Sequence, residues 1–86
     1  MVIFLQYVDT SGKTKSVNVV IRTADKEIFS GTFFTSMFDT NVNNVTEISY
    51  YVDIVVEHKD YGIVTSSVYN SRNSSDITIN GIFSQS

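Results

Sequence analysis

The chain carries one histidine, His58, and the chemistry of this residue depends on what lies beside it. Asp53 and Asp60 are close to it in the sequence and serines are numerous, so a Ser/His/Asp arrangement for nucleophilic catalysis is the first candidate. Such a triad requires a positioned nucleophile, and the chain has no glycine-flanked serine of the nucleophile-elbow type. We therefore interpret His58 as a turn residue and predict that the protein is not an enzyme.

Three carboxylates, Glu47, Asp53 and Glu57, occupy odd positions of one stretch and could form an acid/base pair or hold a cation. Because a strand rises ~3.4 Å per residue, Asp53 and Glu57 would lie about 13 Å apart, too far for a carboxylate pair. Residues 39–43 have oxygen ligands like those of a calcium loop, but the following glycine and the distal glutamate are missing. We expect neither a metal nor a cofactor.

Basic residues offer a weaker alternative. A small anionic ligand such as a nucleotide could bind to basic side chains and stack on an aromatic ring, and the candidates are Lys13, Lys15, Arg22 and Arg72. The four glycines are isolated, so the sequence has no glycine-rich phosphate loop. Six basic residues in all are too few for the basic face of a duplex-binding protein, so we expect no duplex nucleic acid as partner.

The stretch 45–57 must position most of these side chains. Its even residues from 48 to 56 are apolar and most odd ones are polar, which predicts a long half-buried strand with Val55 as the exception. Residues 58–62 predict a type I turn closed by Gly62 in the left-handed conformation, and 63–69 predict the returning strand. We expect the rest of the chain to pack onto this hairpin.

Two tyrosines join the carboxylates on the polar side of this hairpin, since Tyr51 occupies an odd position and Tyr61 lies at the tip. Aromatic side chains among charges favour recognition surfaces, although tyrosine on a solvated sheet face also serves cross-strand packing. The sequence therefore predicts an acidic, tyrosine-bearing surface for binding another protein, formed by Glu47, Tyr51, Asp53, Glu57 and Tyr61.

Elsewhere the patterns predict strands at 2–8 and 16–22, paired as a hairpin, a loop at 39–44, and a last strand at 76–83 with a bulge or turn at Asn80-Gly81. Residues 28–38 are ambiguous, because neither face of a strand would be clean. Five apolar side chains gather on one face of a helix, namely Phe29, Phe33, Phe34, Met37 and Phe38. We predict a short helix over 31–39, capped by Ser30, despite Gly31 and two β-branched threonines.

These patterns predict a single domain, 1–86, of the α+β class: a small antiparallel sheet of five or six strands with one short helix, or an all-β fold if 28–38 is extended. The 42% apolar content is that of a globular chain. Cysteine is absent, which excludes disulfides and leaves a reducing cytoplasm as the default compartment. No run of about 18 apolar residues occurs, so we expect no membrane partner.

The leading functional prediction is a non-catalytic protein-binding module, such as a small inhibitor of a larger protein, acting through the acidic tyrosine-bearing face. One alternative is a structural subunit of a virion or other assembly, which would use open sheet edges to form a homo-oligomer or to add a strand to another protein. The other alternative is the binder of a small anionic ligand described above.

Overall fold

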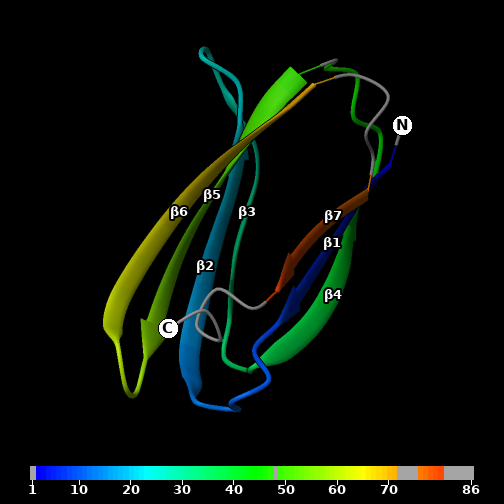
Figure 1. The fold of residues 1–86 in the computed structure, drawn as a ribbon. Coiled ribbons are helices and arrows are strands. Elements are labelled where there is room, and N and C mark those ends of the chain that lie inside the picture. Colours follow the sequence, from blue (N-terminus) through cyan, green and yellow to red (C-terminus); the bar gives the residue numbers. More distant parts are fainter. Residues whose placement is uncertain (1, 48, 72–75, 81–86) are drawn as a thin grey trace.

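The computed structural model describes residues 2–47, 49–71 and 76–80. Within them the chain forms strands only, and no helix that could cross a membrane is found there. The seven strands are β1 (Ile3–Val8), β2 (Thr14–Arg22), β3 (Glu27–Phe33), β4 (Met37–Val42), β5 (Ser49–His58), β6 (Gly62–Ser71) and β7 (Asp76–Asn80) (Figure 1).

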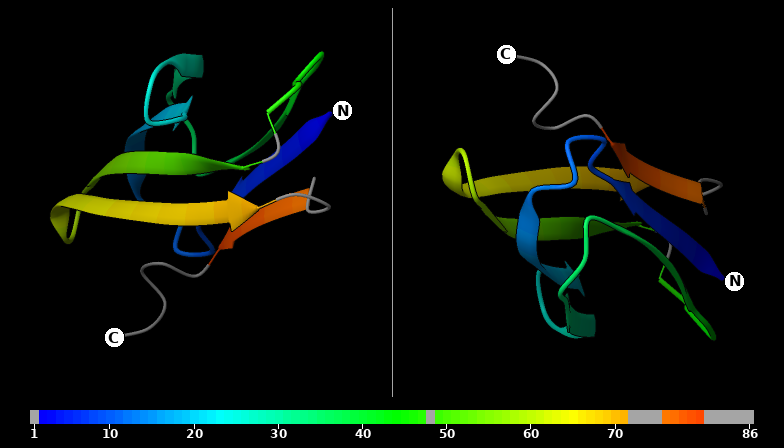
Figure 2. Two further views of the ribbon diagram at one scale, coloured as in Figure 1. Left: turned by 90° about the horizontal axis from the view of Figure 1, so that it is seen from above. Right: turned by 90° about the horizontal axis from the view of Figure 1, so that it is seen from below.

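The strands form two sheets. Sheet A has the order β4-β1-β7, with β1 antiparallel to β4 and parallel to β7. Sheet B has the order β3-β2-β5-β6 and is antiparallel throughout. In Figure 1 sheet A lies on the right and sheet B on the left, and Figure 2 shows the same arrangement from above and below.

One core lies between the sheets, because alternate residues of each strand point inward. The inward positions of β1 and β2 are odd and those of β5 are even, and all of these side chains are buried: Ile3, Leu5, Tyr7, Val17, Val19, Ile21, Tyr50, Val52, Ile54 and Val56. The long half-buried strand predicted in the second half of the chain is thereby confirmed, and Val55 does point outward.

The predicted helix over 31–39 is wrong, and with it the α+β class; the described part of the chain is all-β. The phenylalanines gather because two strands bring them together: Phe33 ends β3, Phe38 lies in β4, and their ring centroids are 3.9 Å apart. Glycine suits position 31 of β3 because the Phe29 ring on the same face covers it. A Cβ at this position would come within 3.2 Å of that ring. Thr35 shapes the reversal between the strands through hydrogen bonds with the backbone of Met37.

Three further predictions need correction. The strands near 2–8 and 16–22 exist, but β1 and β2 belong to different sheets and do not form a hairpin. The predicted loop at 39–44 is mostly strand, since β4 continues to Val42. The described residues form seven strands in two sheets, and β1 pairs in parallel with β7, so the fold is not a single antiparallel sheet. The last strand begins at Asp76 as predicted, and Gly81 lies outside the described residues.

The hairpin of β5 and β6 agrees with the sequence prediction. His58 pairs with Gly62 across a three-residue turn, and the register then runs without a shift to Ser49 opposite Ser71. Gly62 has a φ of 71°, the left-handed conformation that closes such a turn and that glycine adopts without steric penalty. The register fixes which side chains of the two strands lie side by side.

Candidate functional site

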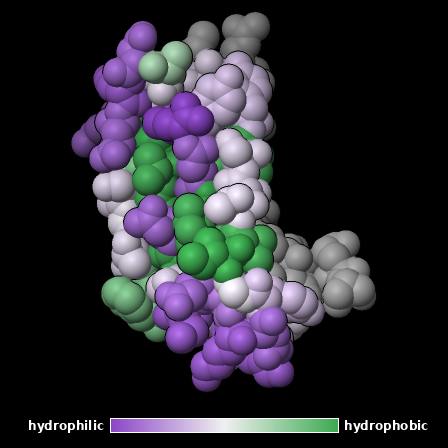
Figure 3. Space-filling model, turned by 90° about the vertical axis from the view of Figure 1, so that its left-hand side faces the viewer, coloured by the Kyte–Doolittle hydropathy of each residue, from purple (hydrophilic) through white to green (hydrophobic). Residues whose placement is uncertain are grey.

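The side of sheet B that faces away from the core, called here the outer face, carries the odd residues of β5. The register places them in rows across the sheet: Arg22, Tyr51 and Tyr69; Val20, Asp53 and Ser67; Asn18, Val55 and Thr65; Ser16, Glu57 and Ile63. Figure 3 looks onto this side of the molecule, where hydrophobic surface gathers across the middle and hydrophilic surface lies mainly above and below.

Aromatic and aliphatic side chains form a large part of the outer face. Tyr51 and Tyr69 lie side by side with ring centroids 5.1 Å apart, and the Arg22 guanidinium lies 4.8 Å from the Tyr51 centroid. The exposed fractions are 36% for Tyr51, 57% for Tyr69, 40% for Val55 and 72% for Ile63. Cation–π contact and ring packing hold Tyr51 in place, so it offers apolar area to a partner with little side-chain entropy left to lose.

The charges of the outer face are paired across strands. Arg22 of β2 donates to Asp53, which also accepts a 2.7 Å hydrogen bond from Ser67 Oγ. The hydrogen bond from Arg22 and then that from Ser67 hold the pKa of Asp53 below its usual range, and Asp53 in turn raises the pKa of Arg22. Lys15 lies 3.5 Å from Glu57. The face is therefore of mixed charge, and the negative charge expected from the sequence is balanced locally.

The five residues predicted to bind a partner do not form one cluster. Tyr51, Asp53 and Glu57 share the outer face. Glu47 precedes β5, and Tyr61 belongs to the turn after it, so these two lie beyond opposite ends of the strand. Three exposed residues of the outer face, Val55, Ile63 and Tyr69, were not among the predicted partner-binding residues.

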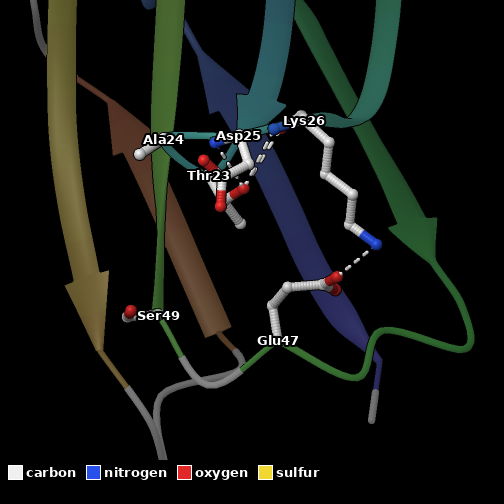
Figure 4. Close-up of a pocket in the computed structure, with 6 residues that line it drawn as sticks. All are labelled: Thr23, Ala24, Asp25, Lys26, Glu47 and Ser49. Atoms are coloured by element: carbon white, nitrogen blue, oxygen red, sulfur yellow. Dashed lines mark hydrogen bonds and ion pairs between the residues drawn. The ribbon is translucent and has the colours of Figure 1, made fainter.

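Glu47 lies at a hollow beside the β2–β3 turn (Figure 4). The hollow is lined by Thr23, Ala24, Asp25, Lys26, Glu47 and Ser49. A 2.7 Å ion pair with Lys26 holds Glu47, and the hydrogen bond from Lys26 is the main reason that the pKa of Glu47 is lowered. The Thr23 hydroxyl accepts hydrogen bonds from the backbone N–H groups of Asp25 and Lys26. These bonds organise the turn, so the hollow is a feature of loop geometry and suggests no ligand.

His58 is buried at the opposite end of the sandwich, among residues from the β1–β2 and β5–β6 connections. Its Nε2 lies 3.2 Å from Asp9 Oδ2 and 3.2 Å from Ser11 Oγ. Its Nδ1 accepts a 3.0 Å hydrogen bond from the backbone N–H of Asp60. The Tyr61 ring packs beside the imidazole, with the two ring centroids 4.9 Å apart. Ser, His and Asp therefore do meet, although the partners are Asp9 and Ser11, which the sequence analysis had not singled out.

The geometry of this cluster is not that of a catalytic triad. Because Nδ1 accepts the Asp60 N–H, the proton of the neutral imidazole is on Nε2, the nitrogen that faces Ser11. The Ser11 hydroxyl donates to Asp9 Oδ1 at 2.7 Å instead. A general base needs a free lone pair on the nitrogen facing the nucleophile, so His58 in this arrangement does not take a proton from Ser11.

Asp9 organises the cluster. Besides Ser11, it accepts a 2.6 Å hydrogen bond from Thr14 Oγ1, which lies 2.8 Å from the Tyr7 hydroxyl. Burial opposes ionisation and is the largest single influence on this carboxyl. The hydrogen bonds from Thr14 and Ser11 together with the nearby His58 outweigh it, so the pKa of Asp9 is lowered. Burial, and to a lesser degree the Asp9 charge, raise the pKa of Tyr7 against the effect of its bond with Thr14.

The basic residues considered for an anionic ligand are engaged with carboxylates where the structure describes them. Lys13 pairs with Asp60 at 2.9 Å, Lys15 with Glu57 and Arg22 with Asp53. Arg72, the remaining candidate, lies outside the described residues. The described parts of the chain also bring together no group of three or more residues suited to bind a metal ion.

In the part of the chain that the structure describes, candidate functional side chains thus gather on the outer face of sheet B and in the Asp9–His58 cluster. Asp9, Thr14 and His58 of the cluster are buried and hydrogen-bonded to one another or to the exposed Ser11, whereas the outer face is open to a partner. No family model, curated protein or solved structure matches this chain.

Proposed function

We propose that this protein is a non-catalytic protein-binding module and that the outer face of sheet B is its binding surface. The observation that carries the proposal is the exposed patch formed by Tyr51, Tyr69, Val55 and Ile63 on adjacent strands. Tyrosine and arginine are enriched in protein interfaces, and Arg22 stacks on this patch. An inhibitor of a larger protein would use the same surface.

The paired charges support a contact of moderate polarity rather than attraction by a strong field. Asp53 and Glu57 of the central strand β5 each pair with a cation of β2, so a partner meets apolar side chains with ion pairs between and beside them. Such pairs are exposed and add little binding energy, but they disfavour partners that bring an unmatched charge. We therefore infer that affinity depends on the tyrosines and that the charges contribute selectivity.

Affinity capture from an extract of the cells that express the protein tests the proposal. The double variant Tyr51→Ala/Tyr69→Ala removes the aromatic pair, and Phe4→Ala is the matched control, because Phe4 is an exposed aromatic residue on the outward side of sheet A. We expect a protein that is captured by the wild type and by Phe4→Ala and is lost from the double variant.

Calorimetry with the purified captured protein then measures the effect. Loss of the two aromatic contacts should weaken binding by about 2 kcal/mol or more, roughly 30-fold. Equal affinity of the double variant and the wild type would refute the outer face as the binding surface, provided that circular dichroism shows both variants to be folded.

A further inference from the structure

We propose that strand β6 pairs with β6 of a second copy of the chain, which joins two four-stranded B sheets into one continuous sheet. The inference does not require the proposed function, because self-association of the purified chain tests it, although Ile63 and Tyr69 belong to both the edge and the outer face. β6 is the last strand of the order β3-β2-β5-β6, so within the described residues one side of its backbone is hydrogen-bonded to β5 and the other side is not paired with a strand.

β6 lacks the features that normally protect an edge strand. Proteins block such edges with charged side chains, prolines, bulges or very short strands. β6 is ten residues long, contains neither a charged residue nor a proline, and keeps an unbroken register with β5. By contrast, β3 at the other edge contains Glu27 and a register shift where it meets β2, and β4 at an edge of sheet A contains Asp39. Of these three edge strands, β6 is the one without such protection.

The sequence of β6 is complementary to itself in one antiparallel register. A two-fold axis perpendicular to the sheet keeps both outer faces on one side. Residues that lie opposite each other must then both be odd-numbered or both be even-numbered, so that their side chains point to the same side of the sheet. With the axis at Ser66, Ile63 lies opposite the partner's Tyr69, and Val64 lies opposite the partner's Val68. The exposed Ile63 and Tyr69 thus meet at both ends of the pairing, and cross-strand pairs of aromatic and β-branched residues stabilise sheets.

This symmetry is the reason to choose a second copy over a strand of another protein. Any strand can use the free backbone groups, but only a two-fold partner makes use of Ile63 and Tyr69 lying three residues on either side of Ser66. An uncharged strand also brings no like charges together across the axis, which a charged edge would do. The resulting dimer would present both outer faces on the same side, with the two tyrosine patches adjoining the new seam.

Sedimentation equilibrium of the full chain, from roughly 1 μM to roughly 1 mM, is the test. We expect a monomer–dimer equilibrium for the wild type. Thr65→Lys should abolish it or weaken it at least about tenfold, because the two lysines would lie about 7–8 Å apart diagonally across the axis. Thr32→Lys is the matched control: Thr32 occupies the opposite end of the same row of sheet B and should leave dimerisation unchanged.

The absence of cysteine allows a second measurement that reports the register. Opposed residues in an antiparallel pair have Cα atoms about 4.5–5.5 Å apart, within the range of a disulfide. Ser66→Cys should therefore give a disulfide-linked dimer under mild oxidation, and Ser30→Cys on β3 should not. The proposal is overturned if the wild type remains monomeric throughout, if Thr65→Lys dimerises as well as the wild type, or if Ser30→Cys forms the cross-linked dimer and Ser66→Cys does not.

Discussion

Replacing Asp9 by alanine tests whether the buried polar cluster holds the end of the sandwich together. Asp9 is 6% exposed and accepts hydrogen bonds from the Ser11 backbone and hydroxyl and from Thr14, with His58 at 3.2 Å. Alanine would leave the fully buried His58 Nε2–H without its carboxylate and would remove three acceptor contacts. Loss of one partner from a buried hydrogen-bonded pair costs several kcal/mol, so we expect about 3 kcal/mol of destabilisation.

Thermal and urea unfolding would measure this change. For a domain of this size about 3 kcal/mol corresponds to a fall in Tm of roughly 12–24 °C. Asp25→Ala is the control, because Asp25 is an exposed aspartate in the β2–β3 turn and should change stability by less than about 0.5 kcal/mol. If Asp9→Ala were also within about 0.5 kcal/mol of the wild type, the cluster would not stabilise the fold as argued.

The pH dependence gives the same test a second readout. The pKa of Asp9 is lower in the folded protein than in the unfolded chain, so its contribution is complete above the unfolded value of about 3.9 and is lost as the pH falls through the folded value. The difference in unfolding free energy between wild type and Asp9→Ala should therefore be constant near neutral pH and shrink below about pH 4. A difference that grew with acidification would contradict the assignment of an ionised Asp9.

Two further predictions concern the β5–β6 hairpin. Gly62→Ala should lower stability by about 1 kcal/mol because alanine is strained at the positive φ of this position. An added Cβ meets no atom within 4 Å, so steric clashes do not contribute. An unchanged Tm would show that the turn is not in this conformation. Ile54→Ala should cost about 3 kcal/mol in urea unfolding and Val55→Ala less than about 1 kcal/mol, since Ile54 is buried and Val55 points outward; equal losses would refute the orientation of β5.

The hydrophobic pattern predicted which residues are buried but not which strands are neighbours. In β5 the alternation of apolar and polar residues was long enough to predict both the strand and its inward face. The glycine after a polar turn predicted the hairpin with β6. The sequence also predicted strands near β1 and β2, which a short connection joins, yet the chain crosses from one sheet to the other between them. The pattern of inward and outward residues in a strand is the same whether the next strand pairs with it or joins the other sheet. The sequence pattern therefore could not show the crossing between β1 and β2.

The helix was predicted because phenylalanines three and four residues apart fit one helical face as well as they fit two short strands. Phe33 and Phe38 stack across the β3–β4 reversal, a contact that depends on the turn at Thr35. Periodicity alone does not separate these cases when the run is short, and Gly31 together with the β-branched threonines was the better signal.

The candidate site was only partly accessible from the sequence. Once the turn is centred on Asp60, the pairing of Tyr51 with Tyr69 follows from counting residues outward along both strands, and Val55 as the exception to the alternation indicated an exposed apolar position. The contact between Ser11 and His58 spans 47 residues and follows no periodic pattern. It arises from the packing of the β1–β2 connection against the end of β5.

Site-specific photo-crosslinking tests the binding role of the outer face most directly. A benzophenone amino acid would replace Val55 on the outer face or, as control, Phe4 on the outward side of sheet A, and the cells would be irradiated. Position 55 should yield a covalent adduct of one discrete mass with a second protein, distinguishable by mass from an adduct between two copies of this chain, and position 4 should not yield that adduct. No discrete adduct at position 55, or the same adduct at both positions, would contradict the outer face as the binding surface.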